Sequence, residues 1–232
     1  MLLTEGSRVP RGRPSGPVPF AAVRLVLASA SPARLSVLRA AGLDPVVEVS
    51  AVDEDAQLAG LGGAPPGEAV VALAGAKATA VARRVGGRLP DAVVVGCDSM
   101  LHVDGALHGK PGDLATARSR WRALAGRTGD LVTGHAVLVL VDGEIDRVAE
   151  GHAVTTVRFG RPDPVELEAY LATGEPLAVA GAFTLDGLGG WFVEGVDGDP
   201  SNVIGISLPL TRRLLAAVGV RVTDLWRAPE QR

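Results

Sequence analysis

Asp98 is the residue whose position in the sequence most strongly suggests chemistry. It closes the apolar run at residues 92–97 and is followed by Ser99. An all-apolar strand is typical of a sheet covered on both faces, and open α/β sheets bind ligands at the carboxyl ends of such strands. A buried carboxylate without a partner is costly. We therefore expect Asp98 to belong to a functional site.

Cations and hydroxyls at other segment ends fit the same kind of site. Lys110 precedes Pro111, which favours an extended backbone at the lysine. Upstream, Ser29, Ser31 and Arg34 fall on a predicted strand-to-helix turn. The free N–H groups of a helix start bind anions, and the serine hydroxyls add donors. An acid, two cations and two hydroxyls together suggest a site for a metal-bound polyphosphate.

Arg34 and two other charged positions each have two interpretations when taken alone. Arg34 in a first helical turn opposes the helix dipole, which a bound phosphate would reverse, but it can also be a solvated side chain on a capped helix. Lys77 falls on the apolar stripe of its helix, so it either extends to water or points into a site. Asp53-Glu54 forms either a solvated turn or a divalent-ion site with Asp98.

Other catalytic patterns are absent from the sequence. Residues 105–111 lack the glycine spacing and the Ser/Thr after the lysine of a P-loop. Residues 187–190 lack the dinucleotide fingerprint, and no Gly-x-Ser-x-Gly elbow occurs. The histidines show no zinc-ligand spacing. Without a histidine nearby in sequence, Cys97 is expected to be a small core residue rather than a nucleophile.

The composition indicates a folded globular protein. The chain has 232 residues, 47% of them hydrophobic. Its net charge of 23 − 26 = −3 and its aromatic content of 3% disfavour a nucleic-acid-binding module. The single cysteine excludes an internal disulfide and fits a reducing compartment. No apolar run reaches the roughly 20 residues of a membrane span.

The elements expected around these residues alternate between strand and helix. Residues 1–22 contain several arginines and prolines without an apolar core, so we expect a flexible leader or a start-codon artefact rather than a secretory signal. Strands are expected at 23–28, 46–52, 92–98, 133–141, 146–159, 191–196 and 203–207. Helices are expected from 32 to Gly42, 65–85, 114–124, 164–173 and 209–218, with a loop at 58–67. This order indicates a single α/β domain over 23–232, with a mixed, twisted sheet, flanking helices and two lobes around a central cleft.

A series of short stretches carries a family resemblance over about residues 23 to 225. They are LASASPAR at 27–34, VDE at 52–54, AKA at 76–78, GCDS at 96–99, GKP at 109–111, GRTG at 126–129, TTVRF at 155–159, AGAF at 180–183, GLGG at 187–190, NVIG at 202–205 and LPL at 208–210. In this order and spacing they resemble the Maf family of nucleoside triphosphate pyrophosphatases.

The resemblance implies a fold related to the inosine triphosphate pyrophosphatases and a cytoplasmic homodimer. It implies hydrolysis of a nucleoside triphosphate to the monophosphate and pyrophosphate with a divalent metal, Mg²⁺ or Mn²⁺. Asp98 falls on the family's proton acceptor. The family's substrate- and metal-contacting positions fall on Ser29, Arg34, Glu54, Lys77 and Lys110.

Three departures leave the base open. The branch that acts on dTTP and UTP has arginine where this chain has Ala33 and glutamine where it has Asp186. The 7-methyl-GTP branch has tryptophan and glutamate there, so Asp186 leans toward it and Ala33 matches neither. Ser99 stands where threonine is common. We expect Ala33 and Asp186 to lie near the base.

The mechanism expected from this resemblance is attack of water on the α-phosphorus. Asp98 deprotonates the water, directly or through a metal that it holds with Glu54. Lys77, Lys110 and Arg34 neutralise phosphate charge, and the helix start adds backbone donors. The alternative is a nucleotide-binding regulator of cell division without significant catalysis, which has less need of the acid.

Overall fold

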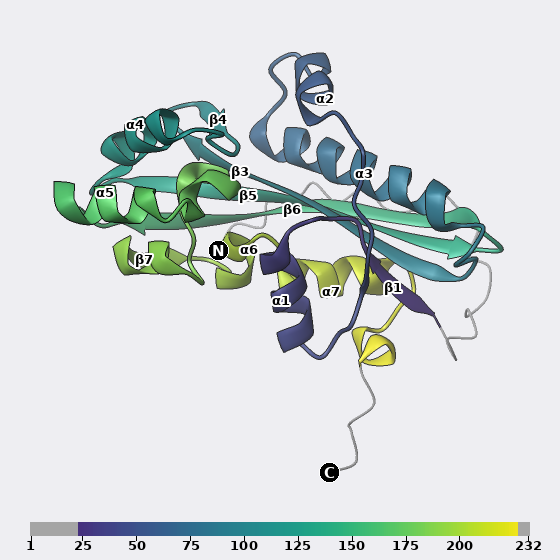
Figure 1. The fold of residues 1–232 in the computed structure, drawn as a ribbon. Coiled ribbons are helices and arrows are strands. Elements are labelled where there is room, and N and C mark those ends of the chain that lie inside the picture. The colour runs from purple at the N-terminus through teal and green to yellow at the C-terminus, as the bar shows by residue number, and fades with distance from the viewer. Residues whose placement is uncertain (1–22, 227–232) are drawn as a thin grey trace, which may run out of the picture. The chain divides into compact units, whose positions relative to one another are not determined.

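The computed structural model describes residues 23–226 and has a mixed α/β architecture (Figure 1). The expected leader, residues 1–22, lies outside the described residues. The sheet has seven strands in the order β2-β1-β3-β5-β6-β7, and β4 pairs with β3. β1 pairs in parallel with β2 and β3, whereas β4 and β7 pair in antiparallel fashion with β3 and β6, so the predicted mixed sheet is confirmed.

The strands are β1 (Arg24–Leu27), β2 (Val46–Val47), β3 (Ala92–Val103), β4 (Ala106–His108), β5 (Thr128–Val141), β6 (Glu144–Phe159) and β7 (Val193–Asp197). The α-helices are α1 (Pro32–Ala40), α2 (Glu54–Gly60), α3 (Pro66–Val85), α4 (Leu114–Leu124), α5 (Pro164–Ala172), α6 (Pro200–Ile204) and α7 (Leu208–Ala217). Short 3₁₀ turns are η1 (Glu175–Ala178), η2 (Ala180–Ala182), η3 (Leu188–Phe192) and η4 (Val222–Leu225). Among residues 23–226, no helix combines the length and apolar character that crossing a membrane requires.

The chain divides into two compact units. Among the described residues, the first contains 23–98, Gly134–His152 and 208–226, and the second contains Ser99–Thr133 and Ala153–Ser207. Strands β3, β5 and β6 each contribute residues to both units. The central cleft expected from the sequence stays a prediction.

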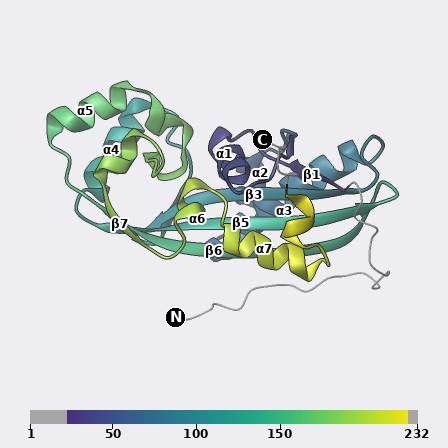
Figure 2. The same cartoon turned by 90° about the horizontal axis from the view of Figure 1, so that it is seen from below.

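The first unit is built around α3, a helix of 20 residues. It is rich in alanine, with Pro66 at its start and basic residues in its last turn, all of which favour a helix. Its apolar face packs in one buried cluster with residues of β1, β3 and β5, among them Val26, Val94 and Leu138. Helix α7 lies on the opposite face of the strands (Figure 2).

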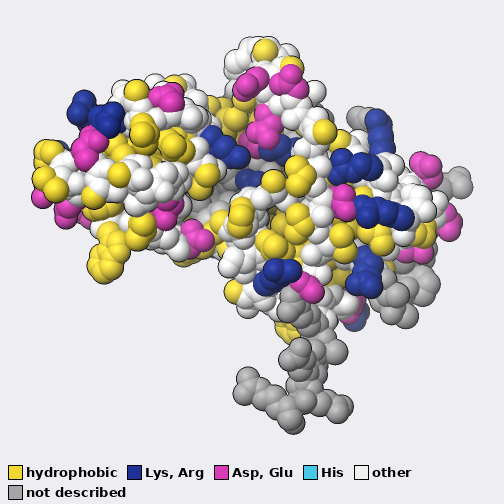
Figure 3. Space-filling view, in the orientation of Figure 1, with side chains coloured by type: hydrophobic (Ala, Val, Ile, Leu, Met, Phe, Trp, Pro, Cys, Tyr) yellow, Lys and Arg dark blue, Asp and Glu magenta, His cyan; other side chains and the backbone are white. Residues whose placement is uncertain are grey.

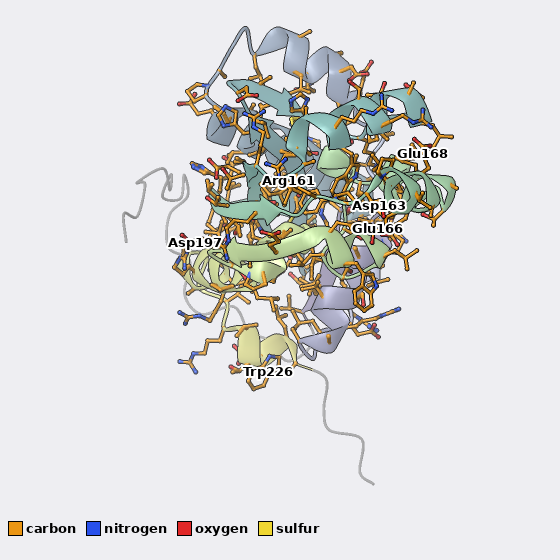
Figure 4. All side chains as sticks on the ribbon, turned by 90° about the vertical axis from the view of Figure 1, so that its left-hand side faces the viewer. Arg161, Asp163, Glu166, Glu168, Asp197 and Trp226 are labelled. Carbon is orange, nitrogen blue, oxygen red and sulfur yellow. The ribbon has the colours of Figure 1, made fainter. Side chains whose placement is uncertain are left out.

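The second unit has an aromatic core. Trp121 of α4 makes edge-to-face contacts with Phe159, Tyr170 and Phe192, and its indole N–H donates to the carbonyl oxygen of Ala182 at 2.7 Å. Each such ring pair adds about 0.5–1.5 kcal/mol beyond area burial. Helix α5 begins with a capping box, in which the side chains of Asp163 and Glu166 each accept from the other residue's backbone amide (both are labelled in Figure 4).

Two predicted strands differ in length because of their partners. The strand expected to end at Asp98 continues to Val103, since its last residues pair with β4 across a turn at Asp104-Gly105. Asp98 therefore lies within β3 rather than at its end. β2 has only two residues, Val46 and Val47, which pair with Val26 and Leu27 of β1. β1 ends at Leu27 and the chain then turns into α1, so β1 offers no further residues for β2 to pair with.

Two predicted non-helical segments lie partly in helices. The loop expected at 58–67 overlaps α2, whose N-cap Asp53 accepts a hydrogen bond from the Ala56 amide at 3.0 Å. The strand expected at 203–207 is wrong, because α6 occupies its start. Asp199 caps that helix and Pro200 stands at its first position, a combination that favours helix over strand.

Candidate active site

Lys77 joins two carboxylates in the first unit. Its Nζ donates to Asp98 Oδ1 at 2.6 Å and lies 2.7 Å from Glu54 Oε1. The Lys77 and Asp98 side chains are only 8% and 6% exposed, whereas Glu54 is 49% exposed. Of its two interpretations, Lys77 therefore points into a polar cluster and does not extend to water. A buried lysine with two acidic partners is the arrangement expected for a functional site.

The position of Lys77 depends on a close helix-to-strand approach. A Cβ placed on Gly96 of β3 would lie 2.5 Å from the Ala74 carbonyl oxygen and 2.9 Å from the Ala78 Cβ. Glycine at 96 and small residues on the facing turn of α3 therefore let the helix backbone lie against the strand. This contact brings Lys77 within reach of Asp98.

Burial and neighbouring charges set the proton affinity of Asp98. Burial is the largest influence and raises the pKa of Asp98 above its ordinary value. The charge and hydrogen bond of Lys77, followed by the charge of Arg34, oppose the rise, and the Glu54 carboxylate adds to it. Within residues 23–226, Asp98 Oδ2 is buried and has no hydrogen-bond partner. Asp98 thus has one oxygen held by Lys77 and one available to accept a proton.

The turn into α1 places Arg34 over its own helix start. Ser31 is the N-cap and accepts from the Arg34 amide at 3.4 Å. Ser29 Oγ accepts from the Ser31 amide at 3.2 Å and from Arg34 Nη1 at 3.0 Å. Because its guanidinium bonds to Ser29 and its charge acts on Asp98, Arg34 is not merely solvated. Ala33, in the same turn, is half-buried.

The remaining predicted site residues belong to the second unit. Ser99 Oγ lies 3.0 Å from Thr133 Oγ1. Lys110 and Asp186 are both exposed. The structure thus brings Ser29, Ser31, Arg34, Glu54, Lys77 and Asp98 into one unit, and places Ser99, Lys110 and Asp186 in the other.

The sequence analysis did not name Arg120, and it named Asp53 only as a partner of Glu54, although each holds a site segment. The Gly109 carbonyl, beside Lys110, accepts from Arg120 Nη1 at 2.5 Å and from the Gly181 amide at 3.2 Å. Asp53 caps α2 and so sets Glu54 at its first turn, where Figure 3 shows acidic side chains gathered over the helix. An Asp N-cap followed by acidic residues was a readable local signal, whereas nothing local pointed to Arg120.

The acidic pair fits a divalent cation of the magnesium type. No group of three or more His, Cys, Asp and Glu side chains able to hold a metal occurs among residues 23–226. Mg²⁺ usually binds through one or two carboxylates together with substrate phosphates and water. The unpartnered Oδ2 of Asp98 and the half-exposed carboxylate of Glu54 match that requirement.

Cys97 has no part in this chemistry. It is fully buried, and burial is the main cause that raises the pKa of its thiol to about 12. A thiolate nucleophile is therefore not formed near neutral pH, and the prediction of a core cysteine is confirmed.

Comparison with known proteins identifies the family. A family model described as Maf-like protein matches residues 24–218. The chain belongs to the Maf-like family. The Maf-like resemblance seen in the motifs is thereby confirmed over the segments that hold Ser29, Lys77, Asp98 and Lys110.

Relatives of this Maf-like protein share most of its length. It is 64% identical over 211 residues to a protein of Saccharopolyspora erythraea, covering 90% of this chain and 100% of the relative. It is 62% identical over 209 residues to one of Nocardia farcinica (88% and 97%), and 60% over 205 residues to one of Rhodococcus jostii (87% and 95%). Each of these relatives is named nucleoside triphosphate pyrophosphatase.

Proposed function

We propose that this Maf-like protein hydrolyses a nucleoside triphosphate to the nucleoside monophosphate and pyrophosphate. The observation that carries the proposal is the buried Asp98, whose Oδ1 is held by Lys77 while its Oδ2 has no partner within the described chain. The names of relatives that are at least 60% identical over nearly their whole length support the same reaction.

Asp98 acts as the proton acceptor in this reaction. Its Oδ2 takes a proton from a water molecule, whose oxygen attacks the α-phosphorus. A new phosphorus–oxygen bond forms, the bond to the bridging oxygen of the β-phosphate breaks, and pyrophosphate leaves. The raised pKa of Asp98 makes it a stronger base than an exposed aspartate. Lys77 keeps the carboxylate oriented throughout.

Cationic side chains balance the charge of the triphosphate. Arg34 lies at the start of α1, where free backbone N–H groups and the Ser31 hydroxyl also face an anion. Lys110 is assigned to the phosphates by its position in the motifs shared with the family. When bound, Mg²⁺ or Mn²⁺ would be held by Asp98 and Glu54 and would neutralise phosphate charge. Preorganised charges of this kind can supply several kcal/mol.

Base recognition is assigned to Ala33 and Asp186, with Ser99 among the substrate contacts, again by position in the shared motifs. An aspartate can accept hydrogen bonds from a guanine-like edge or favour a cationic modified base. The remaining proposals, a homodimer and a cytoplasmic location, rest on the family resemblance alone.

The experiment that tests the function is pyrophosphate release by the purified protein with Mg²⁺ or Mn²⁺. The substrates are dTTP, UTP, CTP, GTP, ATP and 7-methyl-GTP. Release with one preferred nucleotide is the expected result, and an EDTA-treated sample tests the metal. A folded, metal-loaded protein that releases no pyrophosphate from any of them would instead favour the nucleotide-binding regulator.

A further inference from the structure

The carboxylate of Glu175 fastens the segment that carries Asp186. Glu175 Oε1 accepts from the Thr184 hydroxyl at 2.5 Å and from the Gly189 amide at 3.0 Å, and its Oε2 accepts from the Leu188 amide at 3.1 Å. The Gly189 amide also lies 3.1 Å from Thr184 Oγ1. One carboxylate thus holds both sides of the exposed Asp186.

Two glycines of this segment approach neighbouring groups closely. A Cβ on Gly187 would lie 2.7 Å from Glu175 Oε2. A Cβ on Gly189 would lie 2.5 Å from the Tyr170 hydroxyl and 2.7 Å from the Thr184 amide nitrogen. In the run at 187–190, which is no dinucleotide fingerprint, Gly187 is therefore explained by close packing against Glu175, and Gly189 by close packing against Tyr170 and Thr184.

Glu175 is ionised in this setting. Burial opposes ionisation, but the hydrogen bonds from Thr184, Gly189 and Leu188 outweigh it and lower the pKa of Glu175. Hydrogen bonds to a charged acceptor are about twice as strong as neutral ones. The segment is consequently held by strong contacts that Asp186 itself does not make.

We propose that Glu175 is a positioning residue for base selectivity. It holds the Thr184 side chain before Asp186 and the Leu188 and Gly189 amides after it, so that the Asp186 carboxylate meets the base in one geometry. The inference rests on the proposed contact between Asp186 and the base. It assigns no chemical step to Glu175, so catalysis at the phosphates is expected to survive its loss.

The test compares Glu175→Gln with wild type on the preferred nucleotide and on one that differs only in its base. The amide keeps the shape, but it replaces one acceptor oxygen by an NH₂ group that cannot accept a hydrogen bond from a backbone N–H. We expect KM for the preferred nucleotide to rise about 10-fold and the selectivity ratio to fall about 10-fold, with kcat within about 2-fold. The inhibition constant of inorganic pyrophosphate, a ligand without a base, stays unchanged.

Two further variants separate positioning from general damage. Glu168→Gln is a matched change in the same unit: Glu168 lies on α5 (Figure 4) and pairs with Arg118 at 2.6 Å on the surface. We expect it to leave KM and selectivity unchanged. Thr184→Val removes the hydroxyl that bonds to Glu175 and to the Gly189 amide, but it leaves the Leu188 and Gly189 amides on Glu175, so it is expected to shift selectivity in the same direction but less. Thermal melting of each variant checks the fold.

A double-mutant cycle with Asp186→Ala tests whether Glu175 acts through Asp186. If it does, adding Glu175→Gln to Asp186→Ala lowers selectivity no further. If the double variant instead loses selectivity by the product of the two single losses, the inference is overturned. It is also overturned if Asp186→Ala changes selectivity while Glu175→Gln keeps the wild-type value. If Asp186→Ala itself keeps wild-type selectivity, the base contact of the proposed function has failed, and this inference fails with it while pyrophosphate release stands.

Discussion

The acid cluster of the first unit and the Asp186 segment of the second are held by different means. Asp98 is buried and anchored by the side chain of Lys77, which arrives on a helix packed tightly against the strand. Asp186 is exposed, and its segment is anchored through backbone amides that bond to Glu175. Side-chain charge pairing fixes the first region, and backbone hydrogen bonding fixes the second.

This difference teaches how two functions can be adjusted separately. Burial raises the pKa of Asp98, and a raised pKa makes the carboxylate a better proton acceptor. Asp186 is exposed, and the hydrogen bonds that hold its segment are made by other residues. We therefore expect that Asp186 can be replaced without disturbing Asp98 and Lys77.

The largest effect is expected from Asp98→Asn. The amide keeps the volume but cannot accept the proton from water, so we expect kcat to fall by about 10³-fold. Pyrophosphate release under saturating nucleotide measures the loss, and a melting curve shows whether the fold is retained. Activity within a few-fold of wild type would remove Asp98 from the role of proton acceptor.

The second expectation concerns Lys77→Met, which leaves Asp98 buried without its cationic partner. Removing one partner of a buried pair costs about 3–5 kcal/mol of stability. The loss depends on pH, because the pKa of Asp98 is raised further without Lys77. In this variant, protonation of Asp98 stabilises the folded state because it removes a buried, unpaired charge. This contribution is fully present below the unfolded pKa of about 3.9 and is lost as pH rises through the folded pKa.

Urea unfolding of Lys77→Met at pH 5 and pH 8 checks this expectation. The difference from wild type is expected to be greater at pH 8. An equal loss at both pH values would show that Lys77 stabilises the unit by packing alone. Val26 and its core neighbours are untouched, so a change in m-value is not expected.

The third expectation uses glycines to contrast the two regions. Gly96→Ala forces α3 away from β3 and should cost about 1–3 kcal/mol and lower kcat, because overpacking shifts the backbone that carries Lys77. Gly187→Ala should instead lower base selectivity. Gly87→Ala is the control, since a Cβ there meets no heavy atom of the described chain within 4 Å. Identical kinetic changes in the first two variants would contradict the separation.

The smallest effect is expected from pH on the wild-type protein. The pKa of Asp98 is raised, so kcat/KM should begin to fall with acidification above the ordinary aspartate value of about 3.9. The pKa of Glu175 is lowered, so the Asp186 segment stays held over the same range. Rates measured with two nucleotides from pH 8 to 5 should fall together while their ratio stays constant. If the ratio of the two rates changes along with the rates themselves, protonation in the acid cluster also affects the Asp186 segment, and the two regions are not independent.

Much of the fold followed from local signals in the sequence. Ser31-Pro32 and Asp163-Pro164 begin helices where predicted, because an N-cap and a proline at the first position act over a single turn. The helix predicted at 114–124 has those same bounds. The chemical types of Asp98 and Lys77 were likewise recognisable, since a charged residue on an apolar element is unusual whatever surrounds it.

Only the tertiary structure decided which groups pair. Whether Lys77 extends to water or bonds to Asp98 depends on α3 lying against β3, a contact between segments far apart in sequence. The length of β3 depended on its partner β4, and the hydrogen bonds of Glu175 on the amides of Leu188 and Gly189 in a later turn. Local signals act through the backbone of a few residues, whereas a buried charge or a strand end is settled by whichever distant group satisfies its hydrogen bonds.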